Sequence, residues 1–418
     1  MRFFKGFLLG AATAAHQVEG NNIRSDYRAQ EQMPHSSFAE PSGLACDHYN
    51  RYEEDIALMA KAGLNAYRFS IEWARIEPEE GRFDEKETEH YRRVIRCCRE
   101  NGIEPIVTLH HFSSPLWLIR KGGWEADTTP DDFARYARYI GEQLGSDLLY
   151  VCTLNEANMG LQIAQVARQI FLQMQAAGKI QVGINPEDLM RKTGDAAREN
   201  REVFGTENPA VFVSARTAHG DEIVMRSHTA AREALRKVAP HVKVGWTLSL
   251  HDVQSIPGGE EKAREEWDRE FTHYLPVIAE DDFLGVQNYS RTVMGPNGSL
   301  PVPEGAEKTQ MDYEYYPEGL AHVLRRVAQD FHGDLLVTEN GIATSDDARR
   351  RAFIQTALEG VQACMADGLP VKGYFYWSLM DNFEWQKGFS MTFGLIGVDR
   401  KTMKRTPKES LSYLGSWQ

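Results

Sequence analysis

Short runs of apolar residues recur along the chain, and each run ends in a small cluster of polar residues. Between the runs, apolar residues repeat every three or four positions, the spacing of one face of an amphipathic helix. A strand that is covered on both faces reads as a continuous apolar run. The pattern therefore predicts eight inner strands, at 7–13, 65–70, 105–109, 148–154, 242–250, 283–286, 335–338 and 371–378.

Several stretches between these runs carry signals for the start or the end of a helix. Gly63 and Gly102 each follow an apolar stripe at helical spacing and would end a helix. At Thr129 a capping hydroxyl is followed by Pro130 and two acidic residues, a combination typical of a helix start. Helices are predicted over 52–62, over 84–100, from Thr129 onward and over 228–238.

Alternation of eight strands with helices predicts a parallel sheet, and eight such units close a (β/α)₈ barrel, the TIM barrel. Residues 159–222 interrupt the alternation with helical fragments, such as 163–175, between Gly, Asn and Pro residues. We interpret this stretch as an elaborated loop over the functional site. Because no linker or shift in composition divides the chain, residues 1–418 are predicted to form a single barrel domain.

The first apolar run also has features of a secretory signal peptide, since Arg2 and Lys5 precede apolar and then small residues. The apolar part is short, however, and runs directly into His16-Gln17, a polar end like those of the other runs. We interpret it as the first barrel strand, with a cleaved signal as the alternative. No run reaches the ~18–20 apolar residues of a membrane-spanning helix.

Composition narrows the class of function. The 418 residues include 47 Lys or Arg and 60 Asp or Glu, which gives a formal net charge of −13. This balance argues against binding to nucleic acid or to anionic membranes, because both require a basic surface. Five cysteines without CxxC spacing argue against a disulfide framework and predict a cytoplasmic protein. No motif such as HExxH indicates a metal site, and no cofactor is predicted.

Two predicted strands end in a glutamate beside an asparagine, at Asn155-Glu156 and Glu339-Asn340. In a barrel the C-terminal ends of the strands meet at one rim, where active sites lie. Two carboxyl groups facing one cleft suit cleavage of a glycosidic bond, since one donates a proton while the other attacks or stabilises the anomeric centre. Arg68, after the second strand, can reach across the barrel mouth and keep one carboxylate ionised. Unrelated rim acids and a structural ion pair are the alternatives.

Side chains that suit a sugar lie near several predicted strand ends. Amide, imidazole and carboxyl groups bind hydroxyls, and indole rings offer flat apolar faces to the C–H side of a pyranose. Each residue alone is equally typical of ordinary packing, so their shared position at strand ends carries the argument. These residues are Gln17, His111, Glu384, Trp124, Trp377 and Trp385.

Three motifs together resemble glycoside hydrolase family 1, the β-glucosidase/β-galactosidase family. They are YRFSIEW at 67–73, VTENG at 337–341 and WSLMDNFEW at 377–385. The resemblance extends from about residue 7 to residue 408, except for 159–222. It implies a retaining exo-β-glycosidase without a cofactor, whose partners are small β-glycosides or short oligosaccharides. β-Glucosides are the expected substrates, with β-galactosides and β-fucosides as alternatives.

The resemblance also implies roles for individual residues. Glu339 matches the family's nucleophile, and Glu156 matches its general acid/base. Arg68 and Tyr289 match residues that contact the nucleophile. The remaining matches bind the sugar, and among them are the 2-hydroxyl ligand Asn155, the stacking platform Trp377, and Gln17, His111, Glu384 and Trp385.

Three positions depart from the family pattern. Ala157 replaces the proline that follows the acid/base, which frees one backbone angle beside Glu156. Ser113-Ser114 replaces Asp-Leu after His111-Phe112, so the support of His111 is expected to differ. The sixth strand ends in Gln287-Asn288-Tyr289 where Asn-Tyr-Tyr is commoner, which keeps Tyr289 and changes its neighbours.

Three other functions remain as alternatives. A 6-phospho-β-glycosidase resembles the family, but that branch carries serine where Glu384 stands here, and a carboxylate would repel a phosphate. A transglycosylase would use the same residues. A sugar-binding protein that evolved from an enzyme and lost its activity would lack a catalytic glutamate, whereas Glu156 and Glu339 are both present. No feature of the sequence predicts an oligomeric state.

Overall fold

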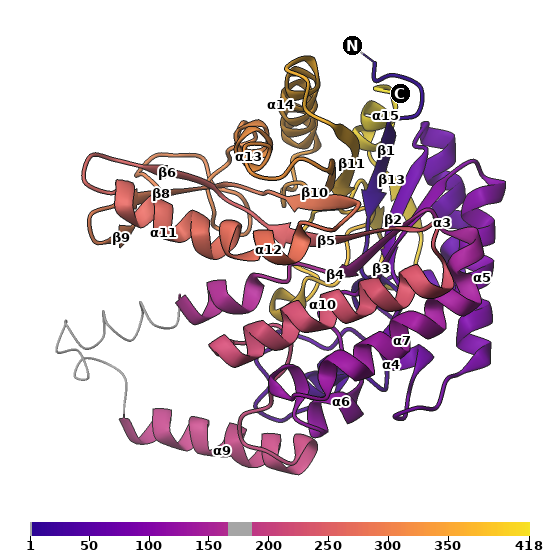
Figure 1. Ribbon diagram of the computed structural model, residues 1–418, viewed down its shortest axis with the longest axis vertical. Coiled ribbons are helices and arrows are strands. Elements are labelled where there is room, and N and C mark those ends of the chain that lie inside the picture. Colours follow the sequence, from indigo (N-terminus) through magenta and orange to yellow (C-terminus); the bar gives the residue numbers. More distant parts are fainter. Residues whose placement is uncertain (1, 166–185) are drawn as a thin grey trace.

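Eight parallel strands close into a barrel in the computed structural model, which describes residues 2–165 and 186–418 (Figure 1). These strands are β1 (Leu8–Ala12), β2 (Ala66–Ser70), β3 (Glu104–His110), β4 (Tyr150–Leu154), β5 (Lys243–Ser249), β7 (Phe283–Gln287), β10 (Asp334–Asn340) and β11 (Val371–Trp377). They follow one another around the barrel in this order, and β11 returns to pair with β1. The predicted (β/α)₈ barrel is therefore confirmed.

The observed strands begin and end within two residues of the predicted ranges. The N-terminal apolar run forms β1, which pairs with β2 on one side and β11 on the other. This position in the barrel wall confirms its interpretation as a strand. Side chains such as Ile106, Tyr150, Phe283 and Phe375 pack together inside the barrel. The interior is thus a packed core, and the C-terminal rim above it is available for chemistry.

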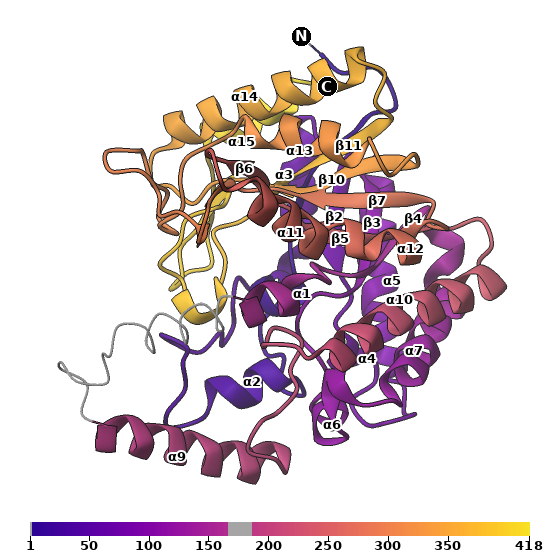
Figure 2. The same cartoon turned by 60° about the vertical axis from the view of Figure 1, so that its left-hand side comes forward.

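Helices surround the outside of the barrel (Figures 1 and 2). The longer ones are α3 (His48–Ala62), α5 (Glu85–Glu100), α7 (Thr129–Leu144), α10 (Ala218–Val238), α11 (Glu260–Glu270), α13 (Gly319–Val327) and α14 (Asp347–Ala366); the shorter ones are α1 (Ala15–Val18), α2 (Asp26–Glu31), α4 (Trp73–Ile76), α6 (Leu116–Arg120), α12 (Leu275–Ile278) and α15 (Glu409–Gly415). None of the helices in the described part of the chain has the length and apolarity required to cross a membrane.

The four helices predicted from apolar spacing are present. On α5, Asp84 caps the first turn by accepting from two backbone N–H groups, and the predicted apolar stripe is buried. The helix α7 begins at Thr129, as predicted, but the prediction that the Thr129 hydroxyl caps it is wrong, since this hydroxyl donates to the carbonyl oxygen of Gly123 at 2.6 Å. The helix α10 begins ten residues before the predicted start, because Thr217 caps it by accepting from the amide of Gly220.

Residues 159–222 are described in part. They include α9 (Pro186–Phe204), the connection 205–217 and the first turn of α10. In both views α9 lies at the edge of the molecule, next to α6 (Figures 1 and 2). Most of the helical fragment predicted at 163–175 lies outside the described residues. That the whole stretch covers the site remains a prediction.

Two small sheets outside the barrel were not predicted. One contains β6 (Asp252–Ser255), β8 (Arg291–Gly295) and β9 (Gly298–Ser299), and the other pairs β12 (Ile396–Val398) with β13 (Arg405–Pro407). Their strands are short and carry many polar residues, so no apolar run marks them. The first sheet follows β5 and β7 and extends the wall of the rim.

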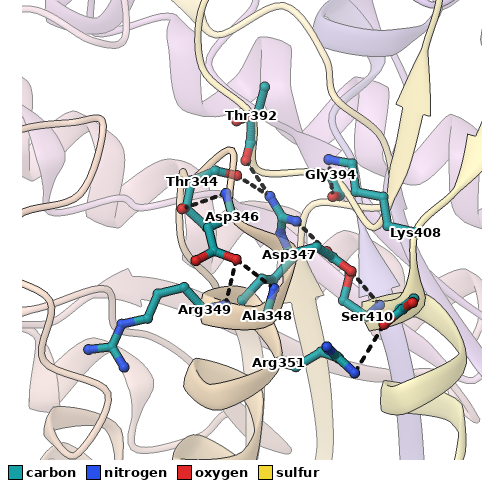
Figure 3. Close-up of polar contacts among 12 residues, drawn as sticks. Thr344, Asp346, Asp347, Ala348, Arg349, Arg351, Thr392, Gly394, Lys408 and Ser410 are labelled. Carbon is teal, nitrogen blue, oxygen red and sulfur yellow. Dashed lines mark hydrogen bonds and ion pairs between the residues drawn. The ribbon is translucent and has the colours of Figure 1, made fainter.

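Arg350, on α14, binds two loops of the C-terminal rim. Its guanidinium donates to the carbonyl oxygens of Thr344 (2.5 Å) and Thr392 (2.8 Å) and to Asp347 Oδ1 (2.5 Å). Figure 3 shows Thr344 and Thr392 side by side above the start of α14, and Asp347 reaching Ser410 at the start of α15. The network therefore fixes the loops that follow β10 and β11.

Arg350→Met should lower the free energy of unfolding by about 1.5–3 kcal/mol, because the change removes the hydrogen bonds of a buried guanidinium to the carbonyl oxygens of Thr344 and Thr392 and its ion pair with the half-buried Asp347. The matched control is Arg351→Met. Arg351 pairs with Glu409, and their side chains are 40% and 77% exposed, so the loss of this surface pair should change stability by less than about 1 kcal/mol. Chemical denaturation of both variants measures the difference, and equal stabilities would contradict the role of Arg350.

Candidate active site

A cavity of about 480 Å³ opens at the C-terminal rim, where β4, β5, β7, β10 and β11 end. Of the ten residues to which the resemblance gives a role, eight line it: His111, Asn155, Glu156, Tyr289, Glu339, Trp377, Glu384 and Trp385. The other two, Gln17 and Arg68, lie behind the cavity and bind residues that line it. A hollow of about 600 Å³ between 21–24 and 74–87 contains none of the ten.

Glu339, near the end of β10, is held by two donors, one on β2 and one in the loop that follows β7. Arg68 crosses the barrel mouth from β2 and places Nη1 2.6 Å from Oε1, while the Tyr289 hydroxyl donates to Oε2 at 2.6 Å. Burial raises the pKa of Glu339, but the Arg68 charge and both hydrogen bonds oppose this by stabilising the ionised form. The reach of Arg68 from the second strand to the seventh barrel strand is confirmed.

Glu156 has a different environment. Among the described residues, no cation lies within ion-pairing distance of it. Burial, together with the nearby charge of Glu339, raises the pKa of Glu156 to about 8. Because only Glu339 contacts a cation, we assign the proton that the pair shares to Glu156. At neutral pH the pair of Glu156 and Glu339 thus consists of one carboxylic acid and one carboxylate, the combination that glycosidic bond cleavage requires.

The backbone at Glu156 lies in the left-handed region, with φ at +44°. Three hydrogen bonds hold it there. The amides of Glu156 and Ala157 donate to the hydroxyl and the carbonyl oxygen of Thr247 (3.1 and 3.2 Å), and Arg216 Nη1 donates to the carbonyl of Ala157 at 2.6 Å. A proline at 157 has no N–H to donate, so the alanine provides a hydrogen bond in place of a fixed backbone angle.

Asn155 has a fixed orientation. Its Oδ1 accepts from Arg68 Nη2 (2.6 Å) and from Gln287 Nε2 (2.8 Å), so its Nδ2 is directed to His111 Nε2 at 3.2 Å. Burial and the Arg68 charge hold the pKa of His111 well below its usual range, so the ring is neutral and Nε2 accepts. The side-chain amide of Asn155 and the imidazole of His111 therefore have fixed orientations before any ligand is bound.

Gln17 and Glu384 form a second polar pair. Gln17 Nε2 donates to the carbonyl of Phe383 at 2.7 Å and to Glu384 Oε2 at 3.2 Å. Burial and the charge of Glu339 raise the pKa of Glu384 to about 8. Trp377 and Trp385 both stack near the His111 ring, with centroids 5.5 and 6.2 Å away. These contacts bring the predicted hydrogen-bonding and aromatic groups into one cavity.

The prediction that Trp124 offers a face to a sugar is wrong. Its side chain is buried, packs against His110, Phe133 and Phe212, and donates Nε1–H to Ser114 Oγ at 3.0 Å. Ser114 also binds His110. Ser114 therefore supports His110, the neighbour of His111, whereas the Ser113 hydroxyl donates to Glu72 at 3.1 Å. His111 Nδ1 has no partner within the described residues.

Several residues that orient the site were not predicted. They are Thr108, which accepts from Arg68 Nε; Gln287, which donates to Asn155; Thr247, beneath Glu156; and His251, in the cavity wall. All four lie within or just beyond predicted strands, near the C-terminal rim. Their position near a strand end was the only feature of the sequence that could have indicated a role in the site, because none of the four belongs to the motifs that carry the resemblance.

Tyr289→Phe should lower kcat about 10–100-fold for aryl β-glycosides, since it removes a 2.6 Å hydrogen bond to a charged carboxylate and leaves the ring in place. Steady-state kinetics measures the effect. Tyr315→Phe is the matched control, because Tyr315 lies outside the cavity and stacks with Arg349. Comparable losses in both variants would contradict a specific role for the Tyr289 hydroxyl.

The sequence profile described as glycosyl hydrolase family 1 matches residues 1–173 and 270–417. The chain belongs to this family. The resemblance predicted from the three motifs is therefore confirmed, and the protein is a retaining O-glycoside hydrolase.

Individual members of glycosyl hydrolase family 1 match over almost their full length. Beta-glucosidase A of Thermotoga maritima is 32% identical over 470 residues, covering 98% of this chain and 96% of the relative. The 1,4-beta-D-glucan glucohydrolase of Thermotoga neapolitana is 30% identical over 467 residues, covering 98% and 96%. The crystal structure of the beta-glycosidase BGL167 superposes with a TM-score of 0.88 at 45% identity, covering 99% and 96%.

Proposed function

We propose that this family 1 enzyme is an exo-acting β-glucosidase that releases glucose from small β-glucosides and short oligosaccharides by double displacement. The observation that carries the proposal is the pair of carboxyl groups in one cavity, Glu339 held ionised by Arg68 and Tyr289 and Glu156 without a cation. The relatives named beta-glucosidase and 1,4-beta-D-glucan glucohydrolase support glucose as the sugar.

In the first step, Glu339 attacks the anomeric carbon while Glu156 donates its proton to the departing oxygen. The glycosidic C–O bond breaks, and an ester bond forms between the sugar and Glu339. In the second step, Glu156, now ionised, removes a proton from water, and the water oxygen attacks the anomeric carbon. The ester bond breaks, Glu339 is restored, and the sugar leaves with its original configuration.

The sugar is bound by the residues around this pair. Asn155 faces the 2-hydroxyl, Trp377 is the platform under the ring, and Trp385 extends the aromatic wall. Gln17, His111 and Glu384 bind the other hydroxyls. Gln17 Oε1 and His111 Nδ1 have no partner within the described residues, so hydrogen-bonding capacity remains in these side chains for a ligand.

A 6-phosphorylated sugar is the less favoured substrate. No lysine lines the cavity in the part of the chain that the structure describes, and its one lining arginine, Arg291, is already paired with Glu314 at 2.7 and 2.8 Å. A phosphate would instead lie near the carboxyl groups of Glu384 and Glu339. A cytoplasmic location remains a prediction that rests on the cysteines, all five of which are free.

A panel of 4-nitrophenyl β-glycosides tests the proposal. The glucoside should give the highest kcat/KM, with the galactoside and fucoside next and the 6-phosphoglucoside last. Proton NMR during hydrolysis should show β-glucose as the first product. An α-anomer as the first product, or a preference for the phosphorylated glucoside, would overturn the assignment. Added methanol measures transfer, because a transglycosylase would form methyl β-glucoside in preference to glucose.

A further inference from the structure

Arg216 lies in the connection between α9 and α10, and it contacts the turn that follows Glu156. Its side chain is 3% exposed, and its Nη1 donates to the carbonyl oxygen of Ala157 at 2.6 Å. Its backbone N–H donates to the carbonyl oxygen of Gly160 at 3.2 Å. Arg216 does not line the cavity. Side chain and backbone of one residue thus bind both ends of the turn 157–160 from outside the cavity.

The Arg216 guanidinium is fixed by further contacts. Its Nη2 donates to the carbonyl oxygen of Phe212 at 3.1 Å, and its Cζ lies 4.9 Å from the centre of the Phe212 ring. Oδ1 of Asp221 lies 3.7 Å from Nη1, and it accepts from the Tyr274 hydroxyl at 2.9 Å. A buried carboxylate that is itself held in place therefore compensates the buried charge of Arg216. Together these contacts fix the direction in which Nη1 points.

The guanidinium has room beside the turn because residue 160 is a glycine. A Cβ atom at Gly160 would lie 2.6 Å from both Cζ and Nε of Arg216, well inside van der Waals contact. Alanine at position 160 would therefore displace the guanidinium from the Ala157 carbonyl without removing any charge. The contact between Arg216 and Ala157 can thus be broken from either of two positions.

The backbone of Ala157 is restrained at both of its polar groups. Its N–H donates to the carbonyl oxygen of Thr247, and its own carbonyl oxygen accepts from Arg216. Alanine has no ring that fixes a backbone angle, so these two hydrogen bonds supply the restraint. Glu156, the preceding residue, depends on it, because its left-handed conformation is unfavourable for a residue with a Cβ atom. A change in the backbone angles of Glu156 would redirect its Cα–Cβ bond and move the carboxyl group.

We propose that Arg216 is a positioning residue for proton donation. By holding the Ala157 carbonyl, it keeps the Glu156 carboxyl directed at the departing oxygen. Glu339 is held separately, by Arg68 and Tyr289, so its attack on the anomeric carbon does not depend on Arg216. The connection between α9 and α10 thereby takes part in acid/base catalysis. This inference rests on the role of Glu156 in the proposed function.

Two glucosides that differ in their need for a proton test the proposal. Phenol leaves with the proton of Glu156, whereas 2,4-dinitrophenolate leaves without one. Arg216→Met, which removes the donors, should lower kcat/KM for phenyl β-glucoside about 10–100-fold and for 2,4-dinitrophenyl β-glucoside less than about 3-fold. For the second substrate, kcat and KM should fall together, because the second step still needs Glu156 as its base.

Two further variants separate the contact from the charge. Gly160→Ala keeps Arg216 and should give the same difference between the two glucosides as Arg216→Met. Arg216→Lys retains a donor and should recover part of kcat/KM for phenyl β-glucoside. Gly160→Ala also becomes the decisive variant if thermal melting shows that Arg216→Met does not fold.

The matched control is Arg232→Met. Arg232 is likewise a buried arginine, with Nη1 2.9 Å from the carbonyl oxygen of Val277 and 2.5 Å from Oδ1 of Asp281, but it lies outside the cavity. Its substitution should lower stability and leave the ratio of the two kcat/KM values unchanged.

The outcomes distinguish this inference from the proposed function. Equal losses on both glucosides in Arg216→Met and Gly160→Ala, or no loss on either, would overturn this inference alone. A Glu156→Ala variant that loses the same factor on both glucosides would overturn the role of Glu156, and with it the proposed mechanism.

Discussion

Replacing Glu339 by alanine should lower kcat for 4-nitrophenyl β-glucoside by on the order of 10⁴-fold or more, because the first step loses its attacking group. The side chain lies between Arg68 and Tyr289, and neither can form the ester bond in its place. Continuous release of nitrophenol measures the loss. Glu318→Ala, an exposed acid outside the cavity, is the control and should retain wild-type activity.

Azide separates loss of the nucleophile from loss of structure. In Glu339→Ala the vacated space admits a small anion, which would attack from the side that Glu339 occupied. Turnover should therefore return, and the product should be the α-glycosyl azide, with inverted configuration. Wild-type activity in Glu339→Ala without azide would refute the assignment of Glu339.

Replacing Glu156 by alanine should have an effect that depends on the leaving group. A sugar or alkyl leaving group needs the proton, so kcat/KM should fall about 10²–10⁴-fold. A 2,4-dinitrophenyl group leaves without a proton, so the loss in kcat/KM should be much smaller. Azide should again raise turnover, but here it replaces water in the second step and gives the β-glycosyl azide. The opposite anomers produced by the two variants identify the two roles independently.

The same residue predicts a pH dependence. Glu156 must be protonated for the first step, and its pKa is raised to about 8. In the wild type, kcat/KM should therefore fall as the pH rises through about 8, since the proton donor is lost. For 2,4-dinitrophenyl β-glucoside in Glu156→Ala this decline should disappear. A decline that persists unchanged would assign it to another group, for which Glu384 is the next candidate.

The barrel could be predicted because its strands are covered on both faces and read as apolar runs. The run ending at Glu339 and the run near the N-terminus both follow this rule, and both are barrel strands. The strands β6 and β8 could not be predicted, since they are partly exposed and depend on each other's backbone hydrogen bonds. The early start of α10 depends on a cap at Thr217 that lies before any apolar stripe.

The cavity could be predicted because chemistry in a barrel gathers at one rim, so strand-end residues such as Glu156 and Arg68 fall together. Trp124 shows the limit of this reasoning, because sequence position does not reveal whether an indole faces a cavity or packs against neighbours such as Phe212. Arg216 shows another limit. It holds the carbonyl next to Glu156 from 59 residues away in the chain, within a stretch that has no regular pattern.

At position 156 the residue that is best for stability differs from the residue that is needed for catalysis, because the backbone there is left-handed. A residue with a Cβ atom pays about 1–2 kcal/mol in this conformation, whereas glycine adopts it freely and asparagine adopts it more readily than glutamate. A mutant library screened only for heat resistance would therefore enrich Gly or Asn at position 156 and yield enzymes that are robust and inactive. Any programme to stabilise this enzyme has to exclude position 156 or screen for turnover at every round.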